Sequence, residues 1–249
     1  MTSAQILQDY KATKTRLLML DYDGTLMPFK PNPPLAKPTK VILNLLERLA
    51  SDPLNKLVII SGREHANLEE WFGGLPLDIA AEHGLFVKEP GRPWQQMLNT
   101  DNAWKKSIMP VMQDYVQRAP GSFTEEKTST LGWHYRTVEP RLASKLAPGL
   151  LSQLREIAPG LGLSILNGDR VIEAKPGNFS KGTVTRYWLG QQNWDFTLAA
   201  GDDVTDEDLF AAMPPSAHTV KIGPGATNAQ TRLPDPSAML KLLDSLAKT

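Results

Sequence analysis

The chain has 249 residues, of which 41% are hydrophobic and 22% charged, as is typical of a folded globular protein with room for one large or two smaller domains. Its 27 basic and 27 acidic side chains balance, so no net positive field favours binding to nucleic acid or to an anionic membrane. Cysteine is absent, which excludes disulfides, thiolate metal ligands and a thiol nucleophile.

The first predicted strand ends in a pair of acids. Residues 1–15 predict a short helix or arm, and residues 16–20 form a short, continuously apolar run that is typical of a central strand in a parallel sheet. Ligands of open α/β sheets bind just beyond the carboxyl ends of the strands, so we expect Asp21 and Asp23 to lie at the edge of a functional crevice. The alternative is an acidic turn without function, because Asp and Gly favour turns.

An Asp-x-Asp pair at a strand end suits phosphoryl transfer. One carboxylate can attack phosphorus and form an aspartyl-phosphate, while a second can protonate the leaving oxygen and then activate water. Two acids this close repel each other, and a bound Mg²⁺ would relieve the repulsion and neutralise phosphate charge. Gly24 permits a tight turn, and we expect its backbone N–H and that of Thr25 to point at phosphate.

A second strand leads to another polar strand end. Residues 28–38 contain five prolines and predict an extended loop, after which Thr39 is expected to cap an amphipathic helix. Residues 57–60 are the second buried strand. Ser61, which follows it, can donate a hydrogen bond to a phosphoryl oxygen, and Arg63 can position a catalytic acid or an anion. Ser-Gly is common in strand–helix turns, so this motif gains weight only from following Asp-x-Asp.

A third strand is predicted at residues 77–84, after a helix at residues 64–72. It ends in Glu82 and His83, so three successive strands carry polar residues to one edge of the sheet. A lone histidine is more often structural, whereas a place at this edge favours function. Both interpretations of His83 stay open at this point.

Residues 95–175 predict a separate α+β domain, inserted between strands of the main sheet. Its order is helix, two strands, helix, two strands, the last pair joined at Asn167-Gly168-Asp169. Arg136, Glu173 and Lys175 lie at its strand ends, and Glu173 and Lys175 share one face of a strand. On the residues alone we favour a solvated charge set for them.

The last two motifs return to the main sheet. Lys181 opens a helix at residues 180–189, where a positive charge opposes the helix dipole unless a phosphate binds there or the lysine extends to solvent. A strand at residues 197–200 then runs into five acids, among them Asp202 and Asp206. Carboxylates clustered after a buried strand are costly without a cation, and their oxygens suit Mg²⁺. A helix start enriched in acids accounts for only part of this cluster.

The ordered set DYDGTL, SGR, KG before a helix and GDDVTDE resembles the haloacid dehalogenase-like (HAD) phosphohydrolases. The EHG, HYR and E-x-K motifs resemble those of trehalose-6-phosphate phosphatases closely, and the similarity spans roughly residues 16–210. The resemblance implies an α/β fold with an HAD-like Rossmannoid core and a parallel sheet, at residues 1–94 and 176–249. It further implies that residues 95–175 are an inserted α+β cap of the C2 type, subclass B.

The resemblance also implies catalytic roles. Asp21 would be the nucleophile and Asp23 the general acid and base. Asp21, the backbone carbonyl of Asp23 and Asp202 would hold Mg²⁺, with Asp206 helping through water. Ser61 and Lys181, with the amides of Gly24 and Thr25, would bind the phosphoryl group. The expected substrate-binding residues are Arg63, Glu82, His83, Arg136, Glu173 and Lys175.

The implied function is Mg²⁺-dependent hydrolysis of trehalose 6-phosphate to trehalose and phosphate, in trehalose biosynthesis. The alternatives are an HAD phosphatase for sucrose-phosphate or mannosyl-phosphoglycerate, a sugar phosphomutase, or a non-catalytic sugar-phosphate sensor. The family often carries a synthase domain in the same chain, and none is found here. With no stretch apolar enough for a signal peptide or membrane span, we expect a free-standing, cytoplasmic and monomeric phosphatase without membrane or nucleic-acid partners.

Overall fold

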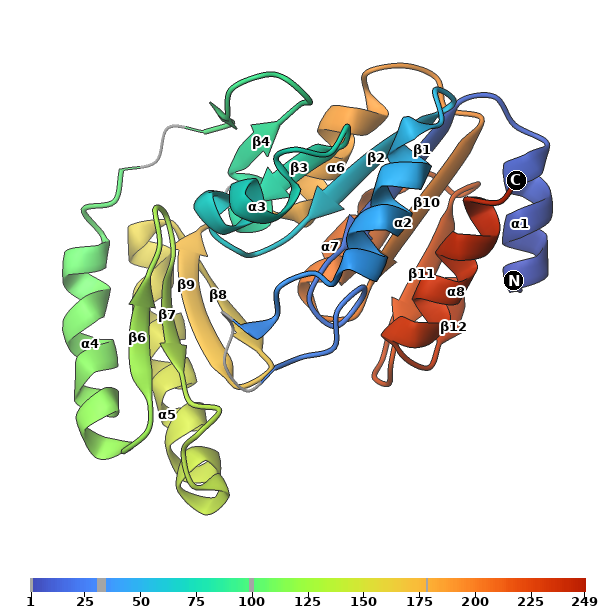
Figure 1. The fold of residues 1–249 in the computed structure, drawn as a ribbon. Coiled ribbons are helices and arrows are strands. Elements are labelled where there is room, and N and C mark those ends of the chain that lie inside the picture. Colours follow the sequence, from blue (N-terminus) through green and yellow to red (C-terminus); the bar gives the residue numbers. More distant parts are fainter. Residues whose placement is uncertain (1, 31–34, 99–100, 178) are drawn as a thin grey trace. The chain divides into compact units, whose positions relative to one another are not determined.

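The computed structural model describes residues 2–30, 35–98, 101–177 and 179–249 (Figure 1). Residues 31–34, within the predicted proline-rich loop, lie outside the described residues. The chain divides into two compact units, which we call the core unit (Met1–Met97 with Ser180–Thr249) and the insert unit (Leu98–Phe179). That the units act as catalytic core and cap stays a prediction.

The core unit is built on one mixed sheet, whose described strands run in the order β12-β11-β10-β1-β2-β3-β4-β5. Its parallel strands are β1 (Arg16–Asp21), β2 (Asn55–Ile60), β3 (Asp78–Ala81), β10 (Phe196–Gly201), β11 (His218–Ile222) and β12 (Thr231–Leu233). β4 (Phe86–Lys88) and β5 (Gln95–Gln96) continue one edge in antiparallel pairing. The predicted α/β class with a parallel sheet is confirmed. β12 was not expected, because three residues are too few to show a period.

β1 lies in the middle of this sheet because both of its faces are apolar. It pairs with β10 on one side and with β2 on the other, and every residue of β1 is buried. Leu17 and Met19 pack against the helices that cover one face of the sheet, where they share a buried cluster with Trp188 and Leu209. A run of consecutive apolar residues is what burial on both faces requires.

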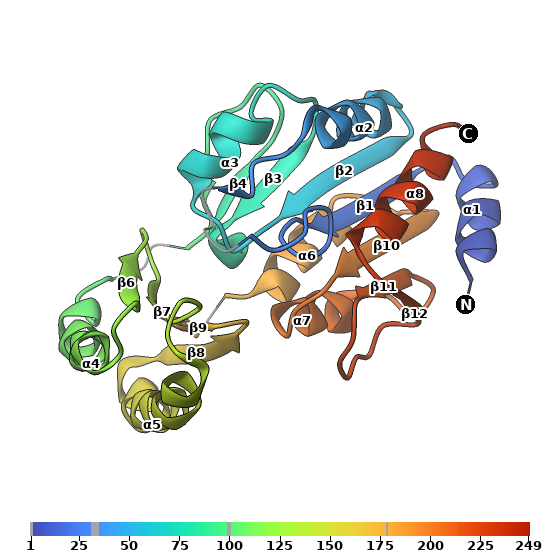
Figure 2. The ribbon, with the colours of Figure 1, turned by 60° about the horizontal axis from the view of Figure 1, so that its bottom comes forward.

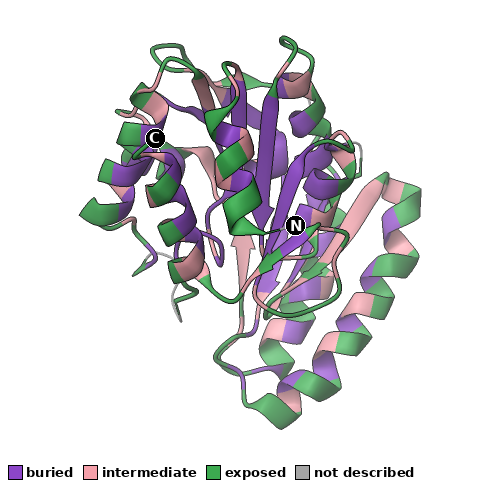
Figure 3. Ribbon diagram, turned by 90° about the vertical axis from the view of Figure 1, so that its right-hand side faces the viewer, coloured by how far each residue is buried: buried purple, intermediate pink, exposed green. Residues whose placement is uncertain are grey.

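Helices cover both faces of the sheet (Figures 1 and 2). On one face lie α2 (Lys40–Ser51), α3 (His65–Phe72) and α8 (Pro236–Leu246), with α1 (Ser3–Lys11) beside α8. On the other lie α6 (Lys181–Leu189) and α7 (Thr205–Ala212). Thr39 caps α2 as predicted, since its hydroxyl accepts from the Ile42 N–H at 3.4 Å. Figure 3 shows the central strands of this sheet buried and the outer sides of the helices exposed.

The insert unit is an antiparallel sheet with helices on one face. The strand order is β6-β7-β9-β8, formed by β6 (Phe123–Glu126), β7 (Leu131–His134), β8 (Leu163–Gly168) and β9 (Val171–Pro176). α4 (Lys105–Arg118) and α5 (Pro140–Ile157) pack on it around a shared apolar core that includes Trp133 and Ile172. Within the described residues, the opposite face of the sheet therefore carries no helix of this unit.

The β8–β9 turn lies later than the predicted Asn167-Gly168-Asp169, because Asn167 and Gly168 still pair with Ile172 and Val171. Gly168 pairs with Val171, so the loop residues are Asp169 and Arg170, and Arg170 adopts a left-handed φ of 61°. This register keeps Ile172 on the core face, and a slip by one residue would move it to the other side. Within the described residues, no helix is long and apolar enough to cross a membrane.

Asp78 gives the core unit a pH-dependent stability. Its side chain is buried, with Lys56 Nζ at 2.7 Å from Oδ2 and no hydrogen-bond partner for Oδ1 within the described residues. Burial raises the pKa of Asp78 from 3.8 to about 6, against the opposing effect of Lys56. The folded protein thus binds this proton more tightly than the unfolded chain, and stability falls as the pH rises from about 4 to above 6. The shift corresponds to roughly 3 kcal/mol.

We therefore expect Asp78→Asn to become more favourable relative to the parent protein as the pH rises. The melting-temperature difference between variant and parent should grow by about 5 °C or more in favour of the variant between pH 4 and pH 8. Thermal unfolding followed by circular dichroism at a series of pH values measures this difference. Asp114→Asn, which changes an exposed acid on α4, is the matched control and should show no such growth. A constant difference for Asp78→Asn would contradict the assignment.

Candidate functional site

Strand register brings three of the predicted site residues to the same edge of the sheet. Asp21 of β1 pairs with Ile60 of β2, so Ser61 follows directly beside it. On the other side Leu20 pairs with Ala200 of β10, and the chain turns into Asp202 two residues later. Three strands that are distant in the sequence thus end side by side.

The centre of the site is a buried lysine between two carboxylates. Lys181 Nζ lies 2.6 Å from Asp21 Oδ1 and 2.7 Å from Asp206 Oδ1, and the Lys181 side chain is only 3% exposed. Its extension into solvent, one of the alternatives left open by the sequence, is therefore wrong. Burial alone would lower the pKa of Lys181, but Asp206 and Asp21 outweigh that effect and raise it. The two carboxylates also resolve the conflict between a lysine and the helix dipole.

A close helix contact lets Lys181 reach these acids. A Cβ atom on Gly182 would lie 2.5 Å from the carbonyl oxygen of Asp208, so only glycine lets the start of α6 come this near to α7. Ser180 caps α6 by accepting from the Thr183 N–H at 3.4 Å. The Lys-Gly pair thus works as a unit, in which the glycine brings the helices together and the lysine pairs with Asp206.

Asp206 also shapes the acidic loop after β10. Its Oδ2 accepts hydrogen bonds from the backbone N–H groups of Asp202 and Asp203, both at 2.9 Å. The backbone carbonyl of Asp202 in turn accepts from Lys221 Nζ of β11. Asp206 is fully buried, so its carboxylate has a structural role in holding the loop as well as its place beside Lys181.

Asp21, Asp202 and Asp206 could hold a metal ion, because one oxygen from each lies within 4.8 Å of the others. Burial raises the pKa of Asp21 to about 7, with Lys181 opposing the rise and Asp206 adding to it. Burial, with the charges of Asp21 and Asp206, raises the pKa of Asp202 to about 9. Asp21 Oδ2 is buried without a hydrogen-bond partner within the described residues. An all-oxygen set with excess negative charge and an unpaired oxygen fits a divalent cation.

Asp23 is held on the other side of the strand end by Arg63. Arg63 Nε lies 2.6 Å from Asp23 Oδ2 and Nη2 lies 2.7 Å from Oδ1, which is a bidentate ion pair. Of the two partners that the sequence allows for Arg63, a catalytic acid or an anion, the structure shows the acid. Ser61 Oγ accepts from the Arg63 N–H at 3.2 Å, which leaves the Ser61 hydroxyl hydrogen available as a donor.

The turn after Asp23 uses its amides internally. The Gly24 N–H donates to the Met27 carbonyl at 2.7 Å, and the Thr25 N–H lies 3.4 Å from the Tyr22 carbonyl. Thr25 Oγ1 is 3.4 Å from Asp202 Oδ1. Both amides thus already have acceptors within the loop, and their binding to phosphate stays a prediction.

The predicted third strand is too long, because Glu82, His83 and Gly84 form a 3₁₀ turn instead of its end. Their φ angles are 49°, 59° and 101°, a run of left-handed residues that cannot continue a strand. The turn is fixed to the preceding motif, since the Glu82 N–H donates to the Arg63 carbonyl and the His83 N–H to the Ser61 carbonyl. Non-glycine residues held in this region are strained and cluster at functional sites.

The Glu82 side chain is fully buried, and its Oε1 lies 3.2 Å from His65 Nδ1. The His83 ring packs against the loop that follows β2, where a Cβ on Gly62 would come within 2.6 Å of the ring. Both residues therefore adjoin the Ser61 loop. Their binding to substrate stays a prediction.

In the insert unit, Glu173 and Lys175 lie on the face of the sheet without helices, as their spacing predicts. For these two residues a solvated charge set is wrong, because their exposed fractions are only 7% and 4%, whereas Arg136 is exposed. Glu173 Oε1 lies 3.1 Å from Lys127 Nζ. Lys175 donates to the Phe179 carbonyl and lies over the Phe179 ring, with Nζ 4.7 Å from its centre.

Sequence reasoning missed other polar residues on this face. Gly132 of β7 pairs with Glu125 of β6 on one side and with Glu173 of β9 on the other. Lys127 Nζ, which contacts Glu173, also lies 3.7 Å from Glu125 Oε2. Glu125 Oε2 lies 2.8 Å from His134 Nε2. The signal that could have found these residues was the alternation of polar and apolar side chains along β6. Arg136 binds Asp169 of the β8–β9 turn: its Nη2 lies 2.8 Å from the Asp169 backbone carbonyl oxygen and 2.9 Å from Asp169 Oδ2.

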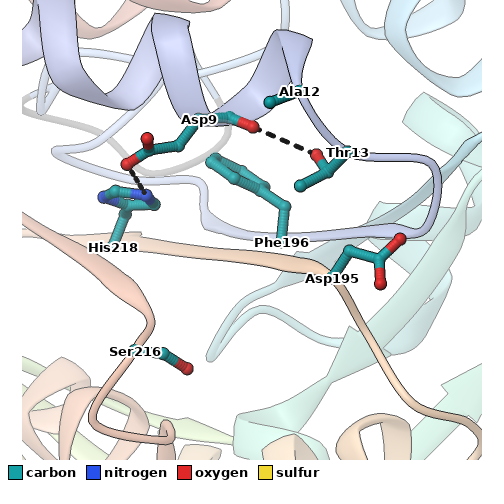
Figure 4. A pocket seen from close by; sticks show the side chains of 7 residues that line it. All are labelled: Asp9, Ala12, Thr13, Asp195, Phe196, Ser216 and His218. Atoms are coloured by element: carbon teal, nitrogen blue, oxygen red, sulfur yellow. Dashed lines mark hydrogen bonds and ion pairs between the residues drawn. The ribbon is translucent and has the colours of Figure 1, made fainter.

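A separate pocket of about 280 Å³ lies at the amino ends of β10 and β11, where α1 packs on the sheet (Figure 4). Here His218 Nε2 lies 3.2 Å from Asp9 Oδ2, and Asp195 accepts the N–H groups of Lys14 and Thr15. These contacts fasten the first helix to the sheet. The pocket contains none of the predicted site residues and lies at the opposite end of the strands from Asp21.

Comparison with known proteins agrees with this geometry. A sequence model described as trehalose-phosphatase matches residues 19–237. The chain belongs to the trehalose-phosphatase family. It is 41% identical over 242 residues to the bifunctional trehalose-6-phosphate synthase/phosphatase of Thermoproteus tenax, covering 97% of this chain and 33% of that relative. It thus spans between a quarter and a third of the length of the curated relatives that it matches.

Solved structures of the trehalose-phosphatase family and beyond share the fold. The C-terminal domain of the trehalose-6-phosphate phosphatase of C. albicans aligns with a TM-score of 0.94 at 31% identity, over 100% of this chain and 97% of that one. A haloacid dehalogenase-like hydrolase of B. subtilis aligns with a TM-score of 0.67 at 14% identity, over 92% and 98%. The second likeness shows that the fold is HAD-like.

Gly24 tests the acid cluster without changing any acid. Its φ is 82°, and an added Cβ would lie 2.2 Å from Asp202 Oδ2, so Gly24→Ala must displace that carboxylate. MgCl₂ should raise the melting temperature of the parent protein, because a ligand that binds the folded state stabilises it, and Gly24→Ala should lose this rise. Gly91→Ala is the matched control, since Gly91 has a φ of 73° and open space around it. An unchanged MgCl₂ response in Gly24→Ala would contradict the proposed cation site.

Proposed function

We propose that the protein hydrolyses trehalose 6-phosphate to trehalose and inorganic phosphate, as a Mg²⁺-dependent phosphatase of trehalose biosynthesis. The observation that carries the proposal is the Asp21–Lys181–Asp206 contact beside Asp202, in a chain of the trehalose-phosphatase family. The choice of substrate is supported by the similarity to a bifunctional trehalose-6-phosphate synthase/phosphatase of T. tenax and to a trehalose-6-phosphate phosphatase of C. albicans. A cytoplasmic location and a monomeric state stay predictions from the sequence.

Mg²⁺ would be held by Asp21 and Asp202, with the backbone carbonyl of Asp23 and with Asp206 through water. When bound, Mg²⁺ offsets charge on the phosphoryl oxygens and on the acids themselves. The carboxylate oxygens of the cluster suit this ion, and the raised pKa values of Asp21 and Asp202 follow from burying acids together. Lys181 supplies one further positive charge next to Asp21.

The proposed chemistry has two steps. In the first, an Asp21 carboxylate oxygen attacks phosphorus, the bond from phosphorus to the sugar oxygen breaks, and the sugar oxygen takes a proton from Asp23. In the second, water attacks the phosphorus of the aspartyl-phosphate and gives a proton to Asp23, which releases phosphate and restores the Asp21 carboxylate. Lys181 and the Ser61 hydroxyl are proposed to hold the phosphoryl oxygens.

The helix-free face of the insert unit is proposed to recognise the disaccharide. Glu173 and Lys175 combine an acceptor and a donor on one face, which is what neighbouring sugar hydroxyls require. Arg136 of the insert unit and, separately, Glu82 and His83 of the core unit are further proposed substrate-binding residues, whereas Arg63 is paired with Asp23. That both Asp21 and Asp23 are present disfavours a non-catalytic sensor.

A substrate panel tests the function. We expect Mg²⁺-dependent phosphate release from trehalose 6-phosphate well above that from sucrose 6-phosphate, glucose 6-phosphate and mannosyl-3-phosphoglycerate. Asp21→Asn should abolish turnover, at least 10³-fold, and retain binding, because it removes the nucleophile and keeps the shape. Phosphate release and calorimetric binding measure the two quantities. Preference for another ester would overturn the substrate, and binding without turnover by the parent protein would favour a sensor.

The insert face has its own test. Glu173→Ala should lower kcat/KM for trehalose 6-phosphate about 10–100-fold, since a buried acceptor for hydroxyls is lost, and leave p-nitrophenyl phosphate hydrolysis unchanged. Asp114→Ala, in α4 of the same unit, should change neither rate. Equal losses on both esters would show that Glu173 acts on stability and not on sugar recognition.

A further inference from the structure

Among the described residues, Arg63 is the side chain that forms an ion pair with the carboxyl group of Asp23. Both Asp23 oxygens accept from the guanidinium, at 2.6 Å and 2.7 Å, in a bidentate pair. We propose that Arg63 is the positioning residue of Asp23 and acts on the reaction through that carboxyl group, instead of contacting the substrate as a ligand. The inference rests on the proposed function and identifies the residue that orients Asp23, its general acid and base.

Arg63 is itself held rigidly enough to serve this purpose. Its guanidinium lies over the Trp71 ring, 4.7 Å from the ring centre, and 5.9 Å from the centre of the Tyr22 ring. Both rings are buried, and the Tyr22 hydroxyl donates to the Ala36 carbonyl at 2.6 Å. A planar cation stacked on a fixed aromatic surface loses little freedom when it pairs with a carboxylate. The Arg63 side chain is 13% exposed, so solvent screens the pair only partly.

The backbone of Arg63 connects the same residue to the rest of the site. Its N–H donates to Ser61 Oγ at 3.2 Å, and its carbonyl accepts from the Glu82 N–H at 2.9 Å. Arg63 therefore contacts three parts of the site: Ser61, the candidate for phosphate binding; Asp23, the candidate acid and base; and the strained turn at Glu82. A shift of the Arg63 side chain would disturb its contact with Asp23 first, because that contact is made by the guanidinium at the end of the side chain.

The pairing leaves Asp23 able to react. Each carboxylate oxygen has two lone pairs, and the guanidinium uses one on each oxygen. The remaining lone pairs point away from Arg63, so the ion pair fixes the plane and direction in which Asp23 meets the leaving oxygen and then the water. A misplacement of such a group by about 1 Å costs on the order of 10²-fold in rate.

Leaving-group dependence separates positioning from substrate binding. An alkoxide leaving from a sugar phosphate needs a proton from Asp23, whereas p-nitrophenolate is a stable anion and needs none. Water attack in the second step needs Asp23 with either substrate. A loss of Asp23 alignment should therefore slow the first step for the sugar ester alone and the second step for both esters.

The experiment is a double-mutant cycle of Arg63→Met and Asp23→Asn, with trehalose 6-phosphate and p-nitrophenyl phosphate. We expect Arg63→Met to lower kcat for the sugar ester about 10²-fold with little change in KM, and to have no further effect in the Asp23→Asn background. With the aryl ester, Arg63→Met should show a pre-steady-state burst of p-nitrophenol that is larger than that of the parent protein.

Additive losses in the cycle, or a raised KM with unchanged kcat, would overturn the proposal, because Arg63 would then bind substrate directly. Arg48→Met is the matched control: Arg48 forms an exposed ion pair with Asp244, and its loss should leave both rates unchanged. Thermal unfolding verifies that each variant is folded. Should Arg63→Met be unfolded, Arg63→Lys is judged by the same criteria, since lysine keeps the charge but cannot form the fork.

The aryl ester also separates this inference from the proposed function. If the parent protein hydrolyses p-nitrophenyl phosphate but not trehalose 6-phosphate, the proposed substrate fails, while the cycle and the burst still decide the role of Arg63. If the parent protein hydrolyses neither ester, the proposed phosphatase function fails, and the role of Arg63 in it fails as well.

Discussion

The ammonium group of Lys181, held between the carboxylates of Asp21 and Asp206, is the interaction on which the rest of the site depends. It joins β1, α6 and α7, and Asp206 in turn holds the loop that carries Asp202. Removing one member would leave an uncompensated buried charge, which typically costs about 3–5 kcal/mol. The charges that the proposed chemistry uses are therefore also charges that keep the core unit folded.

The two units carry polar residues of different character. In the core unit they stand at strand ends, where parallel strands expose backbone and side-chain groups to a single edge. In the insert unit they stand on a sheet face, where an acid and a base lie two residues apart along the chain, as in Glu125 and Lys127 and in Glu173 and Lys175. The first arrangement concentrates charge and suits phosphate and a cation. The second distributes donors and acceptors, and suits hydroxyl groups.

Much of this could be predicted from the sequence because the signals are local. Apolar runs that end in Asp21, Ser61 and Asp202 place strands and their ends without knowledge of the strand order. The sequence left two partners open for Arg63, a catalytic acid or an anion, because the choice between them depends on the register of β1 against β2. The left-handed turn at Glu82 and His83 was also missed, since Glu does not signal a positive φ and a single His signals it only weakly. Glu125 and Lys127 look like ordinary surface charges until β7 sets Gly132 beside them.

The path of the chain through the core sheet affects how the protein is made. Asp21 and its partner Lys181 are 160 residues apart, and the whole insert unit lies between them. During synthesis, β1, β2 and β3 all exist before β10, so β1 presents one open hydrogen-bonding edge until residue 201 has been added. Buried apolar strands with open edges are sites of wrong pairing between chains. The insertion therefore lengthens the interval in which a nascent chain has to be protected from its neighbours.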